Sequence, residues 1–518
     1  MSSVRVEGSP EHPELVFSDN FNVAVPFIDR HLDEGRADKV AIYTIEEEVT
    51  YRQLAQNVNK WGNALTDLSL TPGDRALMVV KDCPEFYYLF WGSIKAGIIP
   101  VPLNTLLRAK DFTFIIEDSG CRSVIYSPEF ADEVEAALDQ VATKPAHVSM
   151  VAGIGESAKT ASAELSVISA TAMSECFWLY SSGTTGEPKG VVHVHRDIVA
   201  TCELYAVRVL GEIEDDIWFS VPKLFFAYGL GCGMTFPLWV GGSAVLDARR
   251  PTPETVTEIF RRFKPTVFAG VPTFYAAWLV DTDLKKEDVS SIRRCISGGE
   301  ALPTDLQTQW RNLCDVPICD GIGSTEALHI YISNRIDDVR PLSSGKVVPG
   351  YELRVADDDG NEVPADEQGR LLLKGPSVTE QYWNNPEKTA NTIVNGWLDS
   401  GDTYYRDGDN YFYYSGRNDD MLKVGGIWVS PFEIESALIE HPKVLEAAVV
   451  GRDDDKGLVK PEAFVVLKEG SDQSDALAAE IKEQCKNNLA PYKYPRWINF
   501  TEELPKTATG KIQRFKLR

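Results

Sequence analysis

The chain of 518 residues is poor in basic side chains and in histidine. It has 52 lysines and arginines against 77 aspartates and glutamates, a formal net charge of −25, and only 7 histidines. Nucleic-acid-binding proteins hold phosphate backbones with clustered Lys and Arg, so this balance excludes a general nucleic-acid binder. The same charge would repel an anionic lipid surface.

Cysteine pairs at the spacing of a zinc or redox site are also missing. The cysteines lie at positions 83, 121, 176, 202, 232, 295, 314, 319 and 485, with no CxxC pair. An odd number without regular spacing in a large chain predicts reduced, mostly buried thiols.

Long hydrophobic runs are absent. No uncharged apolar run approaches the roughly 18 residues of a membrane span, and the best candidate, Val267–Val280, is interrupted by Pro272. The N-terminal sequence MSSVRVEGSPEHPEL lacks the apolar core of a signal peptide. We therefore expect a cytoplasmic protein without a membrane partner.

Short apolar runs alternate with helical patterns over the first two thirds of the chain. The strand-like Arg75–Val80 precedes the helical Pro84–Lys95, and a second such series runs from Trp218 to Gly323. Alternation of this kind predicts an α/β class with largely parallel sheets. We expect two α/β sheet subdomains here.

Beyond residue 350 the pattern changes to short strands separated by Gly, Asp and Asn turns, which predicts a small β-barrel. A last unit from Asn418 carries helices at Pro431–His441 and Asp475–Asn488 with strands between them. We expect an N-terminal domain of residues 1–417 and a small, mobile α+β domain of residues 418–518.

The last 26 residues invert the charge balance, which leaves two interpretations open: a solvated surface or a contact with a polyanion. Only Glu502 and Glu503 oppose the basic residues Lys493, Arg496, Lys506, Lys511, Arg514, Lys516 and Arg518.

A loop rich in glycine and hydroxyls, YSSGTTGEPKG at residues 180–190, follows the apolar run Cys176–Tyr180. Free backbone N–H groups in such a loop form a concavity for an oxyanion, and the hydroxyls add donors. A Walker A loop needs Lys followed by Ser or Thr and then a helix, whereas Lys189 is followed by Gly190 and the alternating VVHVH. The stretch therefore predicts a phosphate-binding turn between two strands, in preference to a plain surface hairpin.

Two histidines, His193 and His195, lie on one face of the strand expected after this loop. No carboxylate or thiolate neighbour completes a ligand set, so we expect packed strand residues rather than a metal site.

Six separated motifs, taken together, resemble the acyl-adenylate-forming (AMP-binding) superfamily, in particular its benzoate-CoA and hydroxybenzoate-CoA ligases. Besides the loop they are SGGEALP (297–303), GIGSTE (321–326), GWLDSGD (396–402), YSGRNDDMLKVGG (414–426) and PKTATGK (505–511). They occur in the family's order and span nearly the whole chain.

The resemblance implies binding of ATP, Mg²⁺ and coenzyme A. Glu326 would hold Mg²⁺, which prefers carboxylate and phosphate oxygens, and Asp402 would accept the ribose hydroxyls. The nucleotide-binding residues that it implies are Ser181, Ser182, Gly183, Thr184, Gly186, Lys189, Gly299, Glu300, Ala301, Asp320, Gly321, Thr325, Asp402 and Arg417.

The catalytic residues implied by the resemblance are Lys511, Thr185 and Glu326. Lys511 would bridge the substrate carboxylate and the α-phosphate, where a cation lowers the barrier between two anions. Asp419 would be the hinge of the C-terminal domain, and the glycines 425 and 426 (Gly425, Gly426) would line the tunnel for the thiol.

The acid pocket is expected from KLFFAYGLG (223–231), FAGVPT (268–273) and the residues after GIGSTE. Bulky side chains there favour a short, flat cavity for an aromatic ring. By resemblance the ring contacts are Ala227, Tyr228, Gly323, His329 and Ile330, with Phe226 as a gating aromatic. Departures at Cys232, Gly233 and Ala327 leave benzoate and substituted benzoates open, and His329 either binds a ring hydroxyl or holds the loop.

The sequence thus favours an AMP-forming acid-thiol ligase for a small aromatic acid. Four alternatives stay open: an enzyme that loads a separate carrier protein, a ligase for a short non-aromatic acid, a phosphotransferase or ATPase that releases ADP, and an inactive paralogue. The sequence ends 7 residues after Lys511, which predicts no fused carrier domain. A homodimer is left open.

Overall fold

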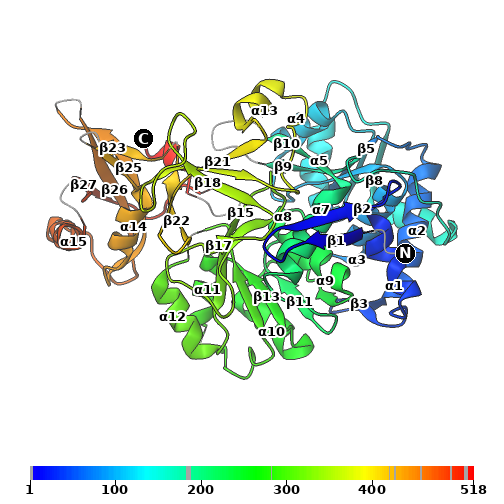
Figure 1. The fold of residues 1–518 in the computed structure, drawn as a ribbon, viewed down its shortest axis with the longest axis horizontal. Helices are drawn as coiled ribbons and strands as arrows, with labels where there is room; N and C mark the ends of the chain where they lie inside the picture. The colour runs from blue at the N-terminus through cyan, green and yellow to red at the C-terminus, as the bar shows by residue number, and fades with distance from the viewer. Residues whose placement is uncertain are drawn as a thin grey trace. The chain divides into compact units, whose positions relative to one another are not determined.

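The chain divides into two compact units in the computed structural model, which describes residues 4–181, 188–281, 283–300, 302–418, 420–424, 427–455, 458–489, 493–506 and 512–518. Unit 1 comprises Met1–Glu352 and Lys374–Leu398, and unit 2 comprises Leu353–Leu373 and Asp399–Arg518 (Figure 1). The expected boundary at residue 417, between an N-terminal domain and a mobile C-terminal domain, stays a prediction.

The larger sheet of unit 1 has nine strands in the order β17-β16-β15-β14-β13-β11-β12-β3-β4. Its centre is parallel, as the alternating pattern predicts, and β16 returns antiparallel along β15. The strands are β3 (Val40–Tyr43), β4 (Glu48–Thr50), β11 (Ile217–Ser220), β12 (Ser243–Val245), β13 (Val267–Gly270), β14 (Arg294–Ser297), β15 (Ile318–Gly323), β16 (Ile330–Ser333) and β17 (Lys346–Val347).

Three helices cover one face of this sheet: α10 (Pro253–Phe263), α11 (Pro272–Leu279) and α12 (Thr304–Leu313). Phe268 of β13 and Trp310 of α12 are fully buried in the core between the sheet and these helices. Edge-on ring pairs join Phe268, Tyr275, Trp278 and Trp310 in that core.

The second sheet of unit 1 is wholly parallel, in the order β6-β5-β7-β8. The elements are β5 (Arg75–Val79), β6 (Ile99–Pro102), β7 (Ser123–Tyr126) and β8 (His147–Met150), with helices α3 (Pro84–Lys95), α4 (Ala109–Ser119), α5 (Ala131–Leu138) and α6 (Val151–Thr160). Strands β5, β6 and β7 are short and almost entirely buried, as expected where helices cover a parallel sheet, whereas the edge strand β8 is partly exposed.

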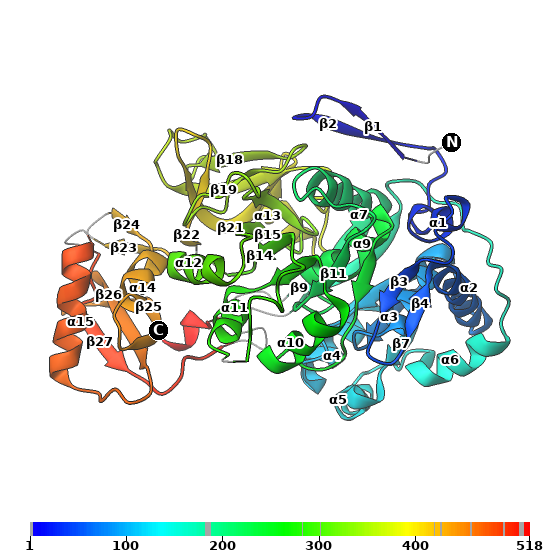
Figure 2. The ribbon, with the colours of Figure 1, turned by 90° about the horizontal axis from the view of Figure 1, so that it is seen from below.

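The other elements of unit 1 include the hairpin β1–β2, which lies beside the N-terminus at the margin of the unit (Figure 2). They are β1 (Val4–Gly8), β2 (Pro13–Phe17), α1 (Arg30–Asp33), α2 (Tyr51–Asp67), β9 (Glu175–Ser181), β10 (Lys189–Val194), α7 (His195–Thr201), α8 (Ala227–Leu230), α9 (Phe236–Val240), α13 (Pro386–Thr392) and β20 (Ile393–Val394).

Unit 2 contains the β-strands expected after residue 350 and a compact α+β part with its own core. The elements are β18 (Glu352–Ala356), β19 (Gly369–Lys374), β21 (Trp397–Arg406), β22 (Phe412–Arg417), β23 (Leu422–Val424), β24 (Ile427–Val429), α14 (Pro431–Ile439), β25 (Val444–Asp453), β26 (Val459–Leu467), α15 (Asp475–Asn488) and β27 (Trp497–Phe500).

All nine cysteines are free thiols, eight of them buried, which confirms the expectation from their spacing. Within the described residues, the helices are too short or too polar to cross a bilayer.

The basic C-terminal residues are largely paired inside unit 2, which neither interpretation of the charge run predicted. Arg514 donates to both carboxylate oxygens of buried Glu435 at 2.7 and 2.9 Å and lies 3.4 Å from Asp420. Lys493 and Lys506 pair with glutamates of the same unit. Arg514 is therefore a structural residue of unit 2.

Replacing Arg514 with Met should destabilise the protein by about 3–5 kcal/mol, because the buried Glu435 carboxylate would lose its charged partner. Lys516→Met, at an exposed position two residues on, is the control and should change stability by less than about 0.5 kcal/mol. Urea unfolding of the two variants measures the difference. Equal stabilities would contradict the structural role of Arg514.

Candidate active site

The glycine-rich stretch joins two antiparallel strands, as predicted. Ser181, the last residue of β9, lies opposite Lys189, the first residue of β10. This arrangement differs from a Walker A loop, which leads into a helix. The residues between them that were expected to bind phosphate, Ser182, Gly183, Thr184, Thr185 and Gly186, lie outside the described residues.

A later segment runs along β10 as a partial third strand. The Trp383 amide donates to the Gly190 carbonyl at 2.7 Å, and Val191 forms an isolated bridge with Tyr382. The Thr379 hydroxyl donates to a β10 carbonyl at 2.7 Å. Residues 377–383 therefore stand beside the phosphate-binding hairpin, although nearly 200 positions separate them in sequence.

Glu326 meets this segment through its side chain. The Tyr382 hydroxyl donates to Oε1 of Glu326 at 3.0 Å, and Nζ of Lys189 lies 6.0 Å from the centroid of the Tyr382 ring. A cation, a phenol and a carboxylate are thus gathered at the base of the hairpin. Sequence reasoning missed Tyr382, because no local pattern marks a contact across 56 positions.

The main chain around Glu326 is also held firmly. Its carbonyl accepts a hydrogen bond from the Thr379 amide at 2.8 Å, and the next carbonyl, of Ala327, accepts from the Ser377 hydroxyl at 2.6 Å. These bonds fix where the Glu326 carboxylate stands relative to the hairpin.

The two histidines have separate roles, and the expectation that they share a strand face was wrong. β10 ends at Val194, and His195 begins α7. Nδ1 of His195 accepts from the Val23 amide at 3.1 Å, and burial lowers its pKa to about 4. His193 instead faces Asp197 and the Thr325 carbonyl. Both are packed residues, as expected.

The carboxyl ends of β14 and β15 bring four of the expected nucleotide-binding residues to one edge of the sheet. Asp320 and Gly321 lie in β15, and Gly299 and Glu300 directly follow β14, whose last residue pairs with Asp320. Oδ1 of Asp320 is buried without a hydrogen-bond partner in the described part of the chain, and burial raises the pKa of this carboxyl to about 8. Ala301 lies outside the described residues.

The predicted ring contacts form one cluster. A Cβ placed on Gly298 would lie 3.9 Å from both Tyr228 Cε1 and Ile330 Cδ1, so these side chains flank a bare strip of main chain. Gly323 pairs with Ile330, and Ala227 begins α8 directly after Phe226.

His329 is buried in this cluster and holds the loop. Its Nε2 donates to the Tyr228 carbonyl at 3.3 Å and lies 3.7 Å from Cys232 Sγ, while burial lowers its pKa to about 3. A side chain at Gly231 would collide with the imidazole, so only glycine fits there. Nδ1 has no hydrogen-bond partner among the described residues, and the ring is therefore neutral with one open acceptor.

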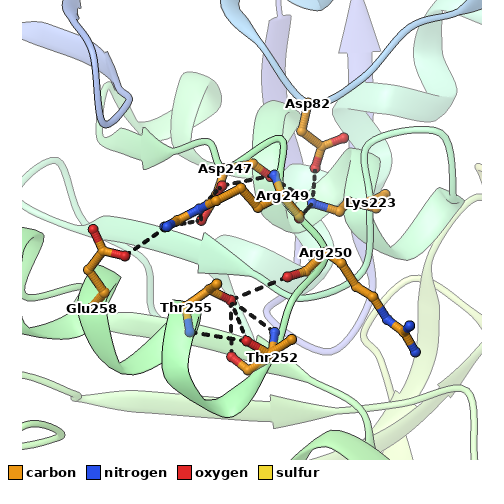
Figure 3. Close-up of polar contacts among 8 residues, drawn as sticks. All are labelled: Asp82, Lys223, Asp247, Arg249, Arg250, Thr252, Thr255 and Glu258. Carbon is orange, nitrogen blue, oxygen red and sulfur yellow. Dashed lines mark hydrogen bonds and ion pairs between the residues drawn. The ribbon is translucent and has the colours of Figure 1, made fainter. Parts of the chain in front are cut away.

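A charged pair anchors the start of the pocket segment (Figure 3). Nζ of Lys223 donates to the carbonyls of Asp247 and Arg249 at 2.6 and 2.9 Å and lies 3.7 Å from Asp82. The other oxygen of Asp82 accepts from the Leu224 amide at 3.1 Å. The segment that carries the ring contacts is thereby joined to two other loops of unit 1.

The loop after Arg249 leads into α10, whose first turn is capped by Thr252. The Thr252 hydroxyl accepts from the Thr255 amide at 3.2 Å, and Arg249 binds both oxygens of Asp247 and one of Glu258 (Figure 3). A rigid loop of this kind gives Lys223 fixed carbonyl acceptors.

In unit 2, the residues expected at the ribose lie opposite each other on β21 and β22. Nη1 of Arg417 donates to Oδ1 of Asp402 at 2.9 Å. The remaining predictions fall outside the described residues: the hinge Asp419, the tunnel glycines Gly425 and Gly426, and the catalytic Lys511.

The described residues contain no cluster of three or more His, Cys, Asp or Glu side chains that would hold a metal by protein ligands alone. Glu326 is partly exposed and pairs with no described lysine or arginine. A single carboxylate with an uncompensated charge fits Mg²⁺, which usually takes one or two carboxylates and completes its shell with phosphates and water.

Family models match most of the chain. Residues 29–383 match the model of the AMP-binding enzyme, and residues 433–511 match that of the AMP-binding enzyme C-terminal domain.

Full-length relatives act on small aromatic acids. The chain is 49% identical to the benzoate–CoA ligase of Thauera aromatica over 98% of this chain and 97% of the relative. It is 43% identical to the 4-hydroxybenzoate–CoA/benzoate–CoA ligase of Rhodopseudomonas palustris, over 96% and 94%. A solved anthranilate CoA ligase in complex with anthranoyl-AMP superposes with a TM-score of 0.92 at 43% identity, covering 97% of each chain.

The raised pKa of Asp320 predicts a pH-dependent contribution to stability. Its folded pKa of about 8 lies above the ordinary value of 3.8. The contribution is therefore complete below pH 3.8 and is lost as the pH rises to about 8. Relative to wild type, Asp320→Asn should gain stability over this range in urea unfolding at several pH values. Parallel pH–stability curves would contradict a neutral Asp320.

Proposed function

Because the chain belongs to the AMP-binding enzyme family, we propose that it joins benzoate or a substituted benzoate to coenzyme A through an acyl-AMP intermediate. Full-length similarity to CoA ligases for benzoate, hydroxybenzoate and anthranilate carries this proposal. The glycine strip between Tyr228 and Ile330 supports it, because bare main chain between two bulky side chains suits a flat ring.

In the first half-reaction, a carboxylate oxygen attacks the α-phosphorus of ATP, and the bond to the β-phosphate breaks to release pyrophosphate. The hairpin and Lys189 hold the triphosphate, Asp402 and Arg417 bind the ribose, and Lys511 bridges the two anions. Glu326 would hold Mg²⁺, which would supply positive charge to the phosphate oxygens. Thr185 adds a donor to the same phosphates.

In the second half-reaction, the sulfur of coenzyme A attacks the acyl carbon, the thiol proton is lost, and AMP leaves. The C-terminal domain turns at Asp419 between the two steps, so that Lys511 withdraws and Gly425 and Gly426 line the path of the pantetheine arm. Glycines suit such a wall, since the arm passes close to the main chain.

Ring recognition rests on the cluster of Phe226, Ala227, Tyr228, His329 and Ile330. The neutral His329 offers Nδ1 as an acceptor, which favours acids whose ring carries a hydroxyl or amino donor. A homodimer in the cytoplasm stays a prediction.

The decisive experiment measures AMP, pyrophosphate and thioester with Mg-ATP, coenzyme A and a panel of acids. We expect AMP and acyl-CoA with benzoate and with hydroxy- or aminobenzoates, and little product with cinnamates or short fatty acids. ADP instead of AMP would show a phosphotransferase or ATPase. AMP without thioester would favour transfer to a carrier protein.

Ile330→Ala should widen the pocket beside Gly298 and raise kcat/KM for benzoates with a bulky substituent, relative to benzoate. Removing buried methyl groups leaves a cavity that a substituent fills. Competition between benzoate and its methyl derivatives measures the shift. An unchanged preference would remove Ile330 from the ring contacts. Val348→Ala is a control at another fully buried aliphatic residue.

A further inference from the structure

His193 joins the phosphate-binding hairpin to the turn that carries Glu326. It lies in β10, four positions after Lys189, and its side chain is fully buried. Nε2 lies 2.9 Å from the Thr325 carbonyl, and Nδ1 lies 2.9 Å from Oδ2 of Asp197. One ring therefore spans two segments that both border the expected phosphates.

Hydrogen-bond chemistry determines the state of this ring. A carbonyl can only accept, so Nε2 carries a hydrogen. Oδ2 of Asp197 also accepts from the Val194 amide at 3.1 Å. His193 is therefore hydrogen-bonded through both ring nitrogens, to Asp197 on one side and to the Thr325 carbonyl on the other.

Two further contacts fix the ring and its partner. The imidazole stacks on Phe177, with ring centroids 5.1 Å apart and planes inclined by 18°. Asp197 lies in the first turn of α7, where a negative charge is favoured by the exposed amides of the helix.

The turn that His193 holds has a strained main chain. The Thr325 carbonyl also accepts from the Leu328 amide at 3.0 Å, and Leu328 has a φ of 64°, a conformation that is costly for a branched side chain. Such a turn persists only where its surroundings hold it. The Nε2–H group of His193 is a directional donor to the same carbonyl.

We propose that His193, held in place by Asp197, is a positioning residue for adenylation. It fixes the positions of Thr325 and Glu326 relative to the hairpin. The phosphate-binding groups of the hairpin and the Glu326 carboxylate, which would hold Mg²⁺, then face the same α-phosphate. The inference rests on the proposed function, because it concerns the ATP half-reaction. It assigns to His193 no contact with substrate.

The test compares three variants of the full-length enzyme. His193→Leu removes both hydrogen bonds, His193→Gln keeps an N–H donor for the Thr325 carbonyl, and Asp197→Asn replaces the carboxyl partner of Nδ1 with an amide. His195→Gln is the matched control, since His195 is also buried but bonds to Val23 on another segment. Thermal unfolding with each variant separates folding defects from activity.

Two half-reactions are measured separately. ATP–pyrophosphate exchange reports adenylation, and thioester formation from supplied benzoyl-AMP reports the second step. His193→Leu should lower kcat/KM for ATP in the exchange reaction by about 10- to 100-fold, the range for leaving one buried acceptor without its donor. Thioester formation should keep most of its rate, and His193→Gln should recover part of the adenylation loss.

Three results would overturn the proposal: an equal loss in both half-reactions, no recovery with His193→Gln, or an equal adenylation loss in His195→Gln. Selective adenylation loss with partial recovery supports it. If wild-type enzyme forms no AMP with any acid, the proposed function fails. The NMR measurement below then still tests the hydrogen bonding of His193.

Nitrogen NMR of the wild-type protein labelled with ¹⁵N-histidine tests the geometry without any assay. The resonances that vanish in His193→Gln identify this ring, and its Nε2 should show the shift of a nitrogen that carries a hydrogen. A bare Nε2 would overturn the hydrogen bond to the Thr325 carbonyl on which the proposal rests.

Discussion

The Thr325 carbonyl accepts hydrogen bonds from two directions, and the arrangement of the proposed catalytic centre in unit 1 depends on them. One bond, from Leu328, closes the turn that presents Glu326, and the other, from His193, ties that turn to the hairpin. Reactions between a carboxylate and a phosphate require donors and cations fixed before the anions meet. If the turn were mobile, Glu326 and the hairpin would have to reach their relative positions during the reaction.

The same need for prearranged groups explains the crowding around Glu326. Tyr382 orients the carboxylate through one oxygen, and Thr379 and Ser377 hold the adjacent main chain. The segment that supplies these contacts pairs with β10, so the hairpin and the acidic turn share one scaffold. Each contact is an ordinary hydrogen bond, and their convergence gives the site its rigidity.

The pocket for the acid follows a different principle, in which small residues create space beside large ones. Gly298 leaves bare main chain between Tyr228 and Ile330, and Gly231 makes room for His329. Asp82 and Lys223 anchor the segment that carries the expected ring contacts. In the proposed ligase, selectivity among ring substituents depends on these few side chains.

Much of this protein was determined by its local sequence. Helices α3 and α15 have the predicted bounds, because apolar periodicity and turn residues act over short distances. The strand after Lys189 excluded a Walker A helix. Tertiary structure alone decided which distant groups meet. Tyr382 reaches Glu326, His193 reaches Thr325 and Arg514 reaches Glu435 across 56, 132 and 79 positions. Such pairs carry no periodicity, since sheet order and helix packing, rather than chain neighbours, bring their hydrogen-bonding atoms together.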